Sequence, residues 1–417
     1  MKKLLLGFVL TFCTLQAAPY DVLVDQDFSP YAGGQDILTG FKLLQLSEDL
    51  LLPPKEEPSE GFWSCTGRFA ELVLVWNPLG EVASVTQHEV FGHGYRIRDI
   101  PSNHVKVTGY QIGVPFPYSL SGGGATEFKM SDRTTVAEYN SITIAGIEAQ
   151  DILARQVKMK WLSDKRIDAR TSQLYFISQQ SLFLYAVASY GEDGIFSDPF
   201  SGNDLESYVH WMNRLYPSDK ISISHLREQS YYNFLDVFTF YSVYAWWNYV
   251  LTGKQMPLPM LEIGKVSYMP GFKVTMAPYG LEKNLENYFI INGVPLFVYV
   301  KWGEHGDVSY YGAGIDYDQL FSWKGGIFGF KIDIWGQPDF MQPTLVTDVL
   351  DGASAASPKL RDRSVGFAGS LISRWYLGGK NTPFYLYTEA GYKSKGYLPG
   401  YSLWSGFVGR VGLSSKF

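Results

Sequence analysis

The sequence is short of cysteine, of positive charge and of long apolar runs, and each shortage counts against a class of protein. Cys13 and Cys65 are its only cysteines, and Cys13 lies in a predicted leader, so the mature chain can form no internal disulfide. The formal net charge of −6 makes nucleic acid a poor partner. Residues 171–191 and 237–253 carry no charge, but glutamines in the first and dense Tyr and Trp in the second favour buried helices, or helices lying against a membrane surface, over transmembrane helices.

The N-terminus has the pattern of an export signal. Lys2 and Lys3 form a charged start, residues 4–14 form an apolar run, and residues 15–18 form a small-residue cleavage zone. The apolar run is too short for a membrane anchor. We therefore predict a signal peptide over residues 1–18 and an exported mature protein.

Histidine is scarce as well, with 6 in the chain, yet two of them flank a glutamate in the run HEVFGHG at residues 88–94. In the zinc-protease helix motif HExxH the histidines are four residues apart, whereas His88 and His93 are five apart. That spacing carries the second imidazole roughly 140° round an ideal helix, where the two rings cannot share an ion. A one-residue π-bulge would bring them together, and Gly92 is where the backbone deforms most easily. The alternative interpretation is a helix end at residues 92–94, with a histidine near the negative end of the helix dipole.

The same run resembles the HExxGH(G) signature of the dipeptidyl peptidase III family of zinc metallopeptidases. The resemblance implies that His88 and His93 bind zinc and that Glu89 is the catalytic base acting on zinc-bound water. It also implies that a glutamate from a downstream helix completes the metal site. The likeness covers residues 88–94, and the second half of the chain is unlike that family.

A long helix is predicted downstream of the motif, over residues 135–161, with apolar residues along one side. Within it, Glu148 is flanked by small residues, as a helix pressed closely against another requires, and we predict it as the third metal ligand. Asp151 is a supporting or alternative ligand, and Glu138 is the runner-up. The alternative to metal binding is that any one of these carboxylates simply lies on a helix face exposed to solvent.

Between the motif and this helix, residues 104–130 read as two strands joined by segments rich in proline and glycine. In zincin-type proteases a strand edge beside the metal commonly holds extended substrate. The hairpin is therefore a candidate for substrate binding, and a purely structural hairpin is the alternative.

Past residue 257 the apolar residues recur with period two, in about eight segments that carry glycine and tyrosine throughout. Such strands, apolar on one face and charged on the other, are typical of a small outer-membrane barrel with a polar lumen. The charged face is predicted to carry Lys331, Asp333, Glu389 and Arg410. The final Phe417 resembles the C-terminal signature of Gram-negative outer-membrane barrels. A soluble antiparallel barrel or sandwich, with the apolar side inward, is the alternative.

Together these observations predict an α+β multidomain protein: a mainly helical, zincin-like domain over residues 19–256 and an antiparallel β-barrel of about eight strands over residues 257–417. The predicted function is that of a zinc metallopeptidase in the outer membrane or periplasm of a Gram-negative bacterium, with a peptide or protein substrate and outer-membrane lipid as a partner. One alternative is a non-enzymatic outer-membrane β-barrel protein with a helical plug or interaction domain and a structural metal site. Another is a hydrolase of a non-peptide substrate that uses the same zinc chemistry.

Overall fold

The strand-rich half of the chain and one strand near the N-terminus fold into one antiparallel sheet of ten strands, in the order β1-β14-β13-β12-β11-β10-β9-β8-β7-β6. The computed structural model describes residues 19–53, 60–120, 122–189, 202–306, 308–341, 344–350, 363–379 and 382–416. The predicted signal peptide and Phe417 lie outside these ranges. The strands of the sheet are β1 (Tyr20–Asp25), β6 (Leu261–Ile263), β7 (Val266–Ala277), β8 (Gly280–Ile291), β9 (Val294–His305), β10 (Val308–Trp323), β11 (Gly326–Pro338), β12 (Arg363–Tyr376), β13 (Phe384–Lys393) and β14 (Gly406–Ser415).

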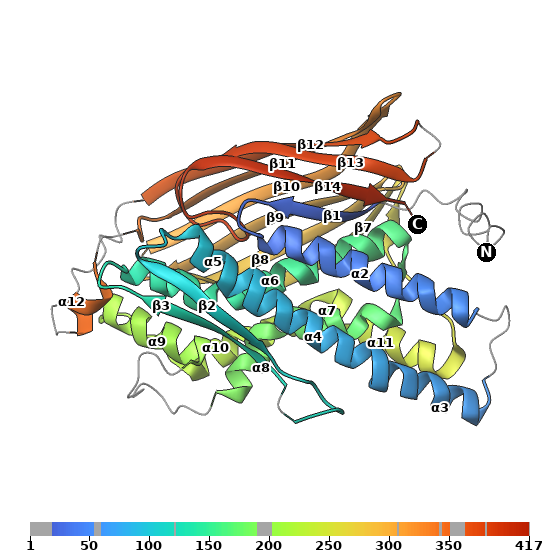
Figure 1. The fold of residues 1–417 in the computed structure, drawn as a ribbon, viewed down its shortest axis with the longest axis horizontal. Coiled ribbons are helices and arrows are strands. Elements are labelled where there is room, and N and C mark those ends of the chain that lie inside the picture. Colours follow the sequence, from blue (N-terminus) through green and yellow to red (C-terminus); the bar gives the residue numbers. More distant parts are fainter. Residues whose placement is uncertain are drawn as a thin grey trace.

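The prediction of a closed barrel is wrong. Eight long strands, β7 to β14, follow one another as neighbours, but the sheet ends at β1 and β6, and these two do not pair with each other. The edge of β14 is taken by β1, which comes from the N-terminal part of the chain. Helices instead of further strands cover the inner face of the sheet, so the sheet stays open (Figure 1).

The predicted alternation of the strands is confirmed. In β11, Ile332 and Ile334 are exposed on the outer face, whereas Lys331 is buried on the inner face. In β13, Glu389 and Lys393 are buried on the side opposite Phe384. The charged face therefore points inward, toward the helices, and the apolar face points outward.

The remaining chain forms a helical layer against the inner face of the sheet, with a separate hairpin (Figure 1). Among the described residues, no helix is both long enough and apolar enough to cross a membrane. The helices are α2 (Pro30–Leu51), α3 (Phe62–Glu71), η1 (Leu72–Trp76), α4 (Asn77–His88), η2 (Glu89–His93), α5 (Gly94–Asp99), α6 (Val136–Asp164), α7 (Ala169–Gln179), α8 (Ser181–Ala188), α9 (Asp204–Leu215), α10 (Ile223–Ser230), η3 (Tyr231–Leu235), α11 (Val237–Thr252) and α12 (Val346–Leu350). The hairpin consists of β2 (Val105–Ile112) and β3 (Gly124–Met130), and a short bridge joins β4 (Arg166–Ile167) to β5 (Met256–Pro257).

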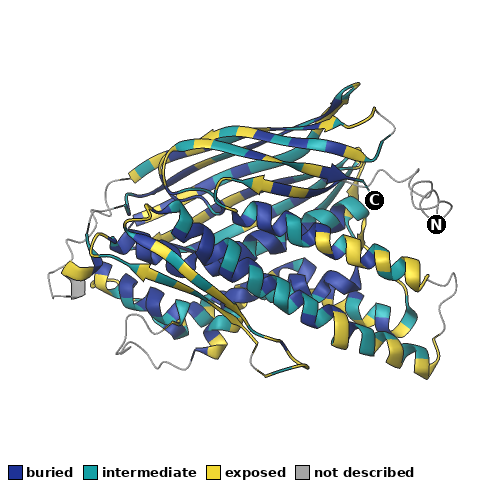
Figure 2. Ribbon diagram, viewed as in Figure 1, coloured by how far each residue is buried: buried dark blue, intermediate teal, exposed yellow. Residues whose placement is uncertain are grey.

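Helix α6 is the centre of the molecule. Its first turn is fixed by a capping box, in which the Thr135 hydroxyl accepts from the backbone N–H of Glu138 while the Glu138 carboxylate accepts from the backbone N–H of Thr135. Most of the helix is buried, and it packs against β7 and β9 on one side and against α4, η2, α7 and α9 on the other (Figure 2). Residues of α6 belong to both large apolar clusters of the core. Side chains on opposite faces of α6 therefore meet entirely different neighbours.

Candidate metal centre

The segment that carries the HEVFGHG run is one helix that contains a turn of π-helix. Helix α4 ends at His88, the π-helical η2 spans Glu89–His93, and α5 continues from Gly94. The extra residue in this turn places the two imidazoles on one side of the helix, with their Nε2 atoms 3.0 Å apart. The predicted π-bulge is confirmed, and the alternative of a helix that ends at residues 92–94 is wrong. A second π turn, η1, occurs one helical segment earlier and was not predicted.

Two glycines allow α6 to cross the π turn at close range. A Cβ atom on Gly92 would lie 2.6 Å from the carbonyl oxygen of Ala145, and one on Gly146 would lie 2.5 Å from Cδ2 of His88 and closer still to its Nε2. Both distances are well inside van der Waals contact. The His88 ring therefore lies directly over the backbone of α6 at Gly146.

A carboxylate from a third helix completes the cluster. Oδ2 of Asp204, the first residue of α9, lies 3.0 Å from Nε2 of His88 and 3.2 Å from Nε2 of His93. The start of α9 is fixed by Asn203, whose side-chain oxygen accepts from the backbone N–H groups of Leu205 and Glu206. Within the described part of the chain, this trio is a group of side chains with the spacing needed to hold a metal ion.

The hydrogen bonds on the far side of each ring determine which nitrogen faces the cluster. Nδ1 of His93 lies 2.7 Å from the carbonyl oxygen of Ile142, which can only accept, so this nitrogen carries the proton. Nδ1 of His88 lies 3.1 Å from Oε1 of Gln150, whose amide nitrogen donates to Ser84 and is thereby oriented. Both Nε2 atoms therefore turn a lone pair toward Asp204, as metal-ligating histidines do.

Charge around the trio favours a cation at its centre. Burial lowers the pKa of His93, but the charge and the hydrogen bond of Asp204, the charge of Glu89 and the contact with the Ile142 carbonyl together outweigh burial and raise that pKa to about 9. Burial raises the pKa of Asp204, yet its contacts with His93 and His88 hold this pKa well below the usual range. Two lone pairs and an anionic oxygen at about 3 Å repel one another unless a positive charge lies between them. In the metal-free protein that charge is a proton on the trio.

A neutral hydroxyl lies next to the trio. The hydroxyl of Tyr185, on α8, is 2.9 Å from Nε2 of His88, and the two rings are stacked with their centroids 5.1 Å apart. Burial, followed by the charges of Asp204 and Glu89, raises the pKa of Tyr185 well above its usual range. Tyr185 therefore stays protonated and can donate a hydrogen bond at the cluster.

The predicted base, Glu89, is buried next to the trio and against the hairpin. Its Oε2 accepts from the hydroxyl of Thr126 on β3 at 2.7 Å. Strand β3 lies so close that a Cβ atom on Gly124 would be 2.7 Å from Cγ of Glu89. The charge of Glu89 also contributes to the raised pKa of His93. The carboxylate is thus placed between the candidate ligands and the strand that was predicted as a substrate edge.

Glu148 is not part of the cluster, contrary to the prediction, and the carboxylate that lies beside the two imidazoles is that of Asp204. Both oxygens of Glu148 lie within 3.2 Å of Nη2 of Arg96, and they also accept from the hydroxyl of Tyr397 and the backbone N–H of Gly400. The reason is the helical period. Gly146 faces His88, and Glu148, two residues later, lies roughly 200° further round the helix. The carboxylate therefore points to the opposite side of α6.

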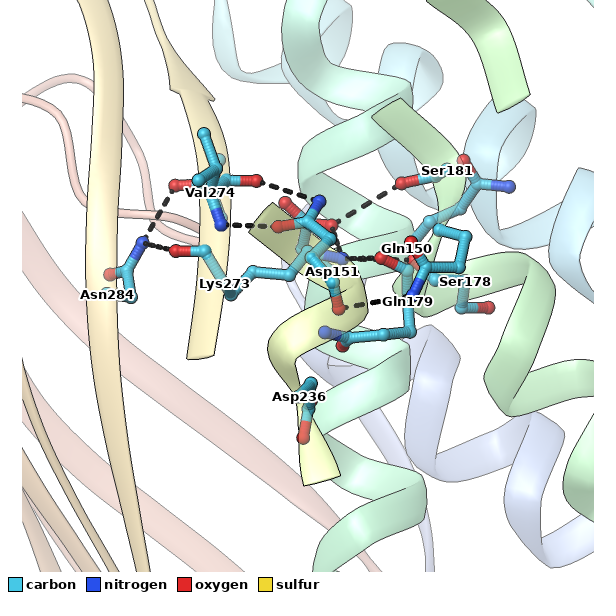
Figure 3. A network of polar contacts seen from close by, with 12 residues as sticks. Gln150, Asp151, Ser178, Gln179, Ser181, Asp236, Lys273, Val274 and Asn284 are labelled. Atoms are coloured by element: carbon cyan, nitrogen blue, oxygen red, sulfur yellow. Dashed lines mark hydrogen bonds and ion pairs between the residues drawn. The ribbon is translucent and has the colours of Figure 1, made fainter. Parts of the chain in front are cut away.

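The other two candidate ligands on α6 have structural partners. Asp151 forms an ion pair of 2.7 Å with Lys273 on β7 and joins α6 to the sheet, with Ser181 nearby (Figure 3). Glu138 caps its own helix and lies 3.0 Å from Nδ1 of His104. Neither carboxylate lies in the cluster of His88, His93 and Asp204.

Asp204, Tyr185 and Gln150 were not predicted from the sequence. A helix start at Asn203-Asp204 is readable from the capping residue and the acidic first turn, but nothing in the sequence connects it with His88. No protein-family model, no curated protein and no solved structure matches this chain. The resemblance of residues 88–94 to a peptidase signature therefore stays a prediction, and the arguments about function rest on the geometry of the site.

Proposed function

We propose that this chain is a zinc-dependent hydrolase with a zincin-like site, acting as a metallopeptidase of the cell envelope. The observation that carries the proposal is the convergence of three ligand atoms, Nε2 of His88, Nε2 of His93 and Oδ2 of Asp204, on one point. A π turn, two glycines and fixed tautomers all serve this convergence. Such built-in features are expected of a binding site and have no evident use in a core of ordinary packing.

The donor set fits zinc. Two neutral imidazoles and one carboxylate are the ligands of many catalytic zinc sites, in which a further position is left for water or substrate. A zinc ion held here would supply Lewis-acid chemistry, lowering the pKa of a water molecule and polarising a substrate carbonyl. The same donors also suit ferrous iron, so the identity of the metal is part of the test.

Around such an ion, the neighbouring side chains have distinct roles. Glu89 takes the proton from the water that attacks the carbonyl carbon and returns it to the amine nitrogen as the C–N bond breaks. Thr126 orients the Glu89 carboxylate through the hydrogen bond to Oε2. Tyr185 remains neutral and donates to the negative charge that develops on the carbonyl oxygen of the substrate. These roles need no residue other than those already within or next to the cluster.

A peptide substrate is supported by the position of the hairpin. Strand β3 pairs with β2 along one edge and lies beside Glu89, as a strand that aligns an extended peptide with the site would. The proposal of a cell-envelope location follows from the predicted signal peptide. A hydrolase of a non-peptide substrate would use the same ligands and the same base, and differs only in what the hairpin holds.

The test compares metal content and peptide cleavage in the purified full chain and in Glu89→Gln. The expected result is about one zinc per chain in both proteins, chelator-sensitive cleavage by the natural chain, and a loss of roughly 100-fold or more in kcat for the variant. Glu206→Gln, on the first turn of α9, is a control that keeps both metal and activity. Bound iron, or a Glu89→Gln variant that cleaves normally, would contradict the proposal. Zinc without hydrolysis of any substrate would favour a structural metal site.

A further inference from the structure

The outer face of the ten-stranded sheet carries exposed apolar side chains on β8 to β14 and on β1. In register, Leu285, Val300, Ala313, Ile334 and Phe367 lie opposite one another from β8 to β12. A second row runs through Trp375, Leu386, Leu413 and Val22, from β12 through β13 and β14 to β1. Val365 and Phe407, on the same face, are 78% and 76% exposed. A continuous apolar surface of this extent is not expected on a protein surrounded by water.

The inner face has the opposite character. Lys301 pairs with Glu282 at 2.9 Å, Arg374 with Asp21 at 2.8 Å, and Arg410 with Glu389 at 2.9 Å, and all of these side chains are buried. A sheet of a water-soluble α/β layer places its apolar side inward and its charges outward. Here the order is inverted, as in proteins whose outer surface is in contact with hydrocarbon.

The dimensions of the apolar face match a bilayer. On β10, Tyr311 and Trp323 mark the two ends of the face, with Trp302 beside the first and Trp375 beside the second. Strand β10 is bulged between Tyr317 and Phe321, so the span is counted on the paired strand β11. There the matching positions Gly336 and Gly326 are ten residues apart, or about 33 Å at about 3.3 Å per residue. A strand tilt of about 45° reduces this span to roughly 23 Å, close to the height of about 25 Å of the apolar band on outer-membrane barrels. Aromatic residues at both ends are typical of the two membrane interfaces.

Apolar side chains are also exposed on the far side of the molecule. Phe62 and Trp63, at the start of α3, and Phe240 and Trp247, on α11, are exposed. Helix α3 lies on the opposite side of the molecule from β12 and β13, so a second copy of the chain seated on the sheet would leave these residues in water (Figure 1). An apolar solvent that surrounds the molecule covers both sides.

From the inverted polarity, the span and the aromatic ends, we propose that the outer face of the sheet is a lipid-contact surface that faces the acyl chains of a bilayer. The ion pairs then lie in a polar interior between the inner face of the sheet and the helices, which cover that face in place of further strands. This inference does not depend on the proposed peptidase activity, because it rests on side chains on the opposite face of the sheet from the metal centre.

The test uses the full chain with Cys13→Ser and Cys65→Ser, reconstituted in phosphatidylcholine vesicles and labelled with bimane at single introduced cysteines. Ile334→Cys and Leu371→Cys probe the outer face on two strands, and Glu228→Cys, on α10, is the exposed polar control. Lipids that carry a doxyl group on the acyl chain should quench the two outer-face labels by about twofold or more, and leave the control label unchanged.

Several results would overturn the inference. The first is a chain that does not enter vesicles at all. The second is outer-face cysteines that react with a water-soluble maleimide as fast as the control. The third is a pair of outer-face cysteines that cross-link two copies of the chain while lipid does not quench them, which would identify a second copy as the occupant. Because the two positions lie on different strands, one variant that fails to fold leaves the other to decide.

Discussion

Gly146→Ala is the substitution whose effect follows most directly from the geometry of the candidate metal centre. The added Cβ would lie 2.5 Å from Cδ2 of His88 and closer to Nε2, so the ring must move by about 1 Å to reach ordinary van der Waals contact. A displacement of about 1 Å at a site of this kind is enough to cost roughly 100-fold in function. We therefore expect zinc affinity to fall by about that factor.

The stability of Gly146→Ala is the balance of two terms. Replacing a helical glycine by alanine stabilises a helix by about 1 kcal/mol, and overpacking costs about 1–3 kcal/mol. The control is Gly40→Ala on α2, where no atom lies within 4 Å of the added Cβ, so the full helix term of about 1 kcal/mol should appear.

The assay combines zinc affinity, measured by competition with a chelator, with the thermal unfolding midpoint of both variants. Gly40→Ala should bind zinc like the natural chain and unfold at a higher temperature. Gly146→Ala should lose zinc affinity while it still unfolds cooperatively. If Gly146→Ala bound zinc as tightly as the natural chain, His88 would not be a ligand held over α6, and the reasoning about this site would be refuted.

Three further predictions concern the same region. Asp204→Asn should lose the bound metal without unfolding, whereas Glu206→Gln on the same turn should keep the metal. Metal analysis of the purified proteins measures both, and equal metal content in the two variants would exclude Asp204 as a ligand. Glu148→Gln should remove one of the two carboxylates that pair with the buried Arg96, leaving Asp99 as the other, and lower the free energy of unfolding by about 3 kcal/mol with zinc retained. Denaturant unfolding measures the loss, and a stable variant without zinc would restore Glu148 as a ligand. Because the pKa of His93 is raised to about 9, the metal-free site holds a proton below that pH. Zinc binding at pH 7 should therefore release about one proton, and zinc affinity should rise with pH up to about 9. Calorimetry in buffers of different ionisation enthalpy measures the release, and its absence would contradict the charge assignment.

The π turn could be predicted because the spacing of the two histidines leaves few other ways to bring their rings together. A pair five residues apart on an α-helix diverges, and a flexible glycine directly before the second histidine indicates where the extra residue is accommodated. The alternation of the strands was predictable for a similar reason, since a period of two assigns each side chain to a face. In both cases the information is local to the segment.

The carboxylate that joins the two imidazoles could not be predicted, because the direction of a side chain on a long buried helix depends on tertiary packing. The small residues around Glu148 did indicate a close helix crossing, and Gly146 forms it with His88. The carboxylate two residues later points to Arg96 and the segment of Tyr397 and Gly400 instead. Asp204 reaches the cluster from another helix far along the chain, and no local pattern marks it.

Closure of the sheet was not predictable either. Alternation determines which face is charged, but it does not determine whether the two edge strands meet. The edge of β14 is occupied by β1, from a part of the sequence with no strand repeat around it, and the charged face is covered by helices that supply Asp151 and Lys158 as counter-charges. An open sheet against helices satisfies the same pattern as a barrel.

The central claim is that His88, His93 and Asp204 hold one zinc ion. X-ray absorption at the zinc edge of the purified chain tests it most directly. The account predicts about one zinc per chain with two imidazole nitrogens and a carboxylate oxygen among its ligands, at distances of about 2.0–2.2 Å. A chain that binds no metal, or a bound metal whose nearest neighbours include no imidazole, would contradict it.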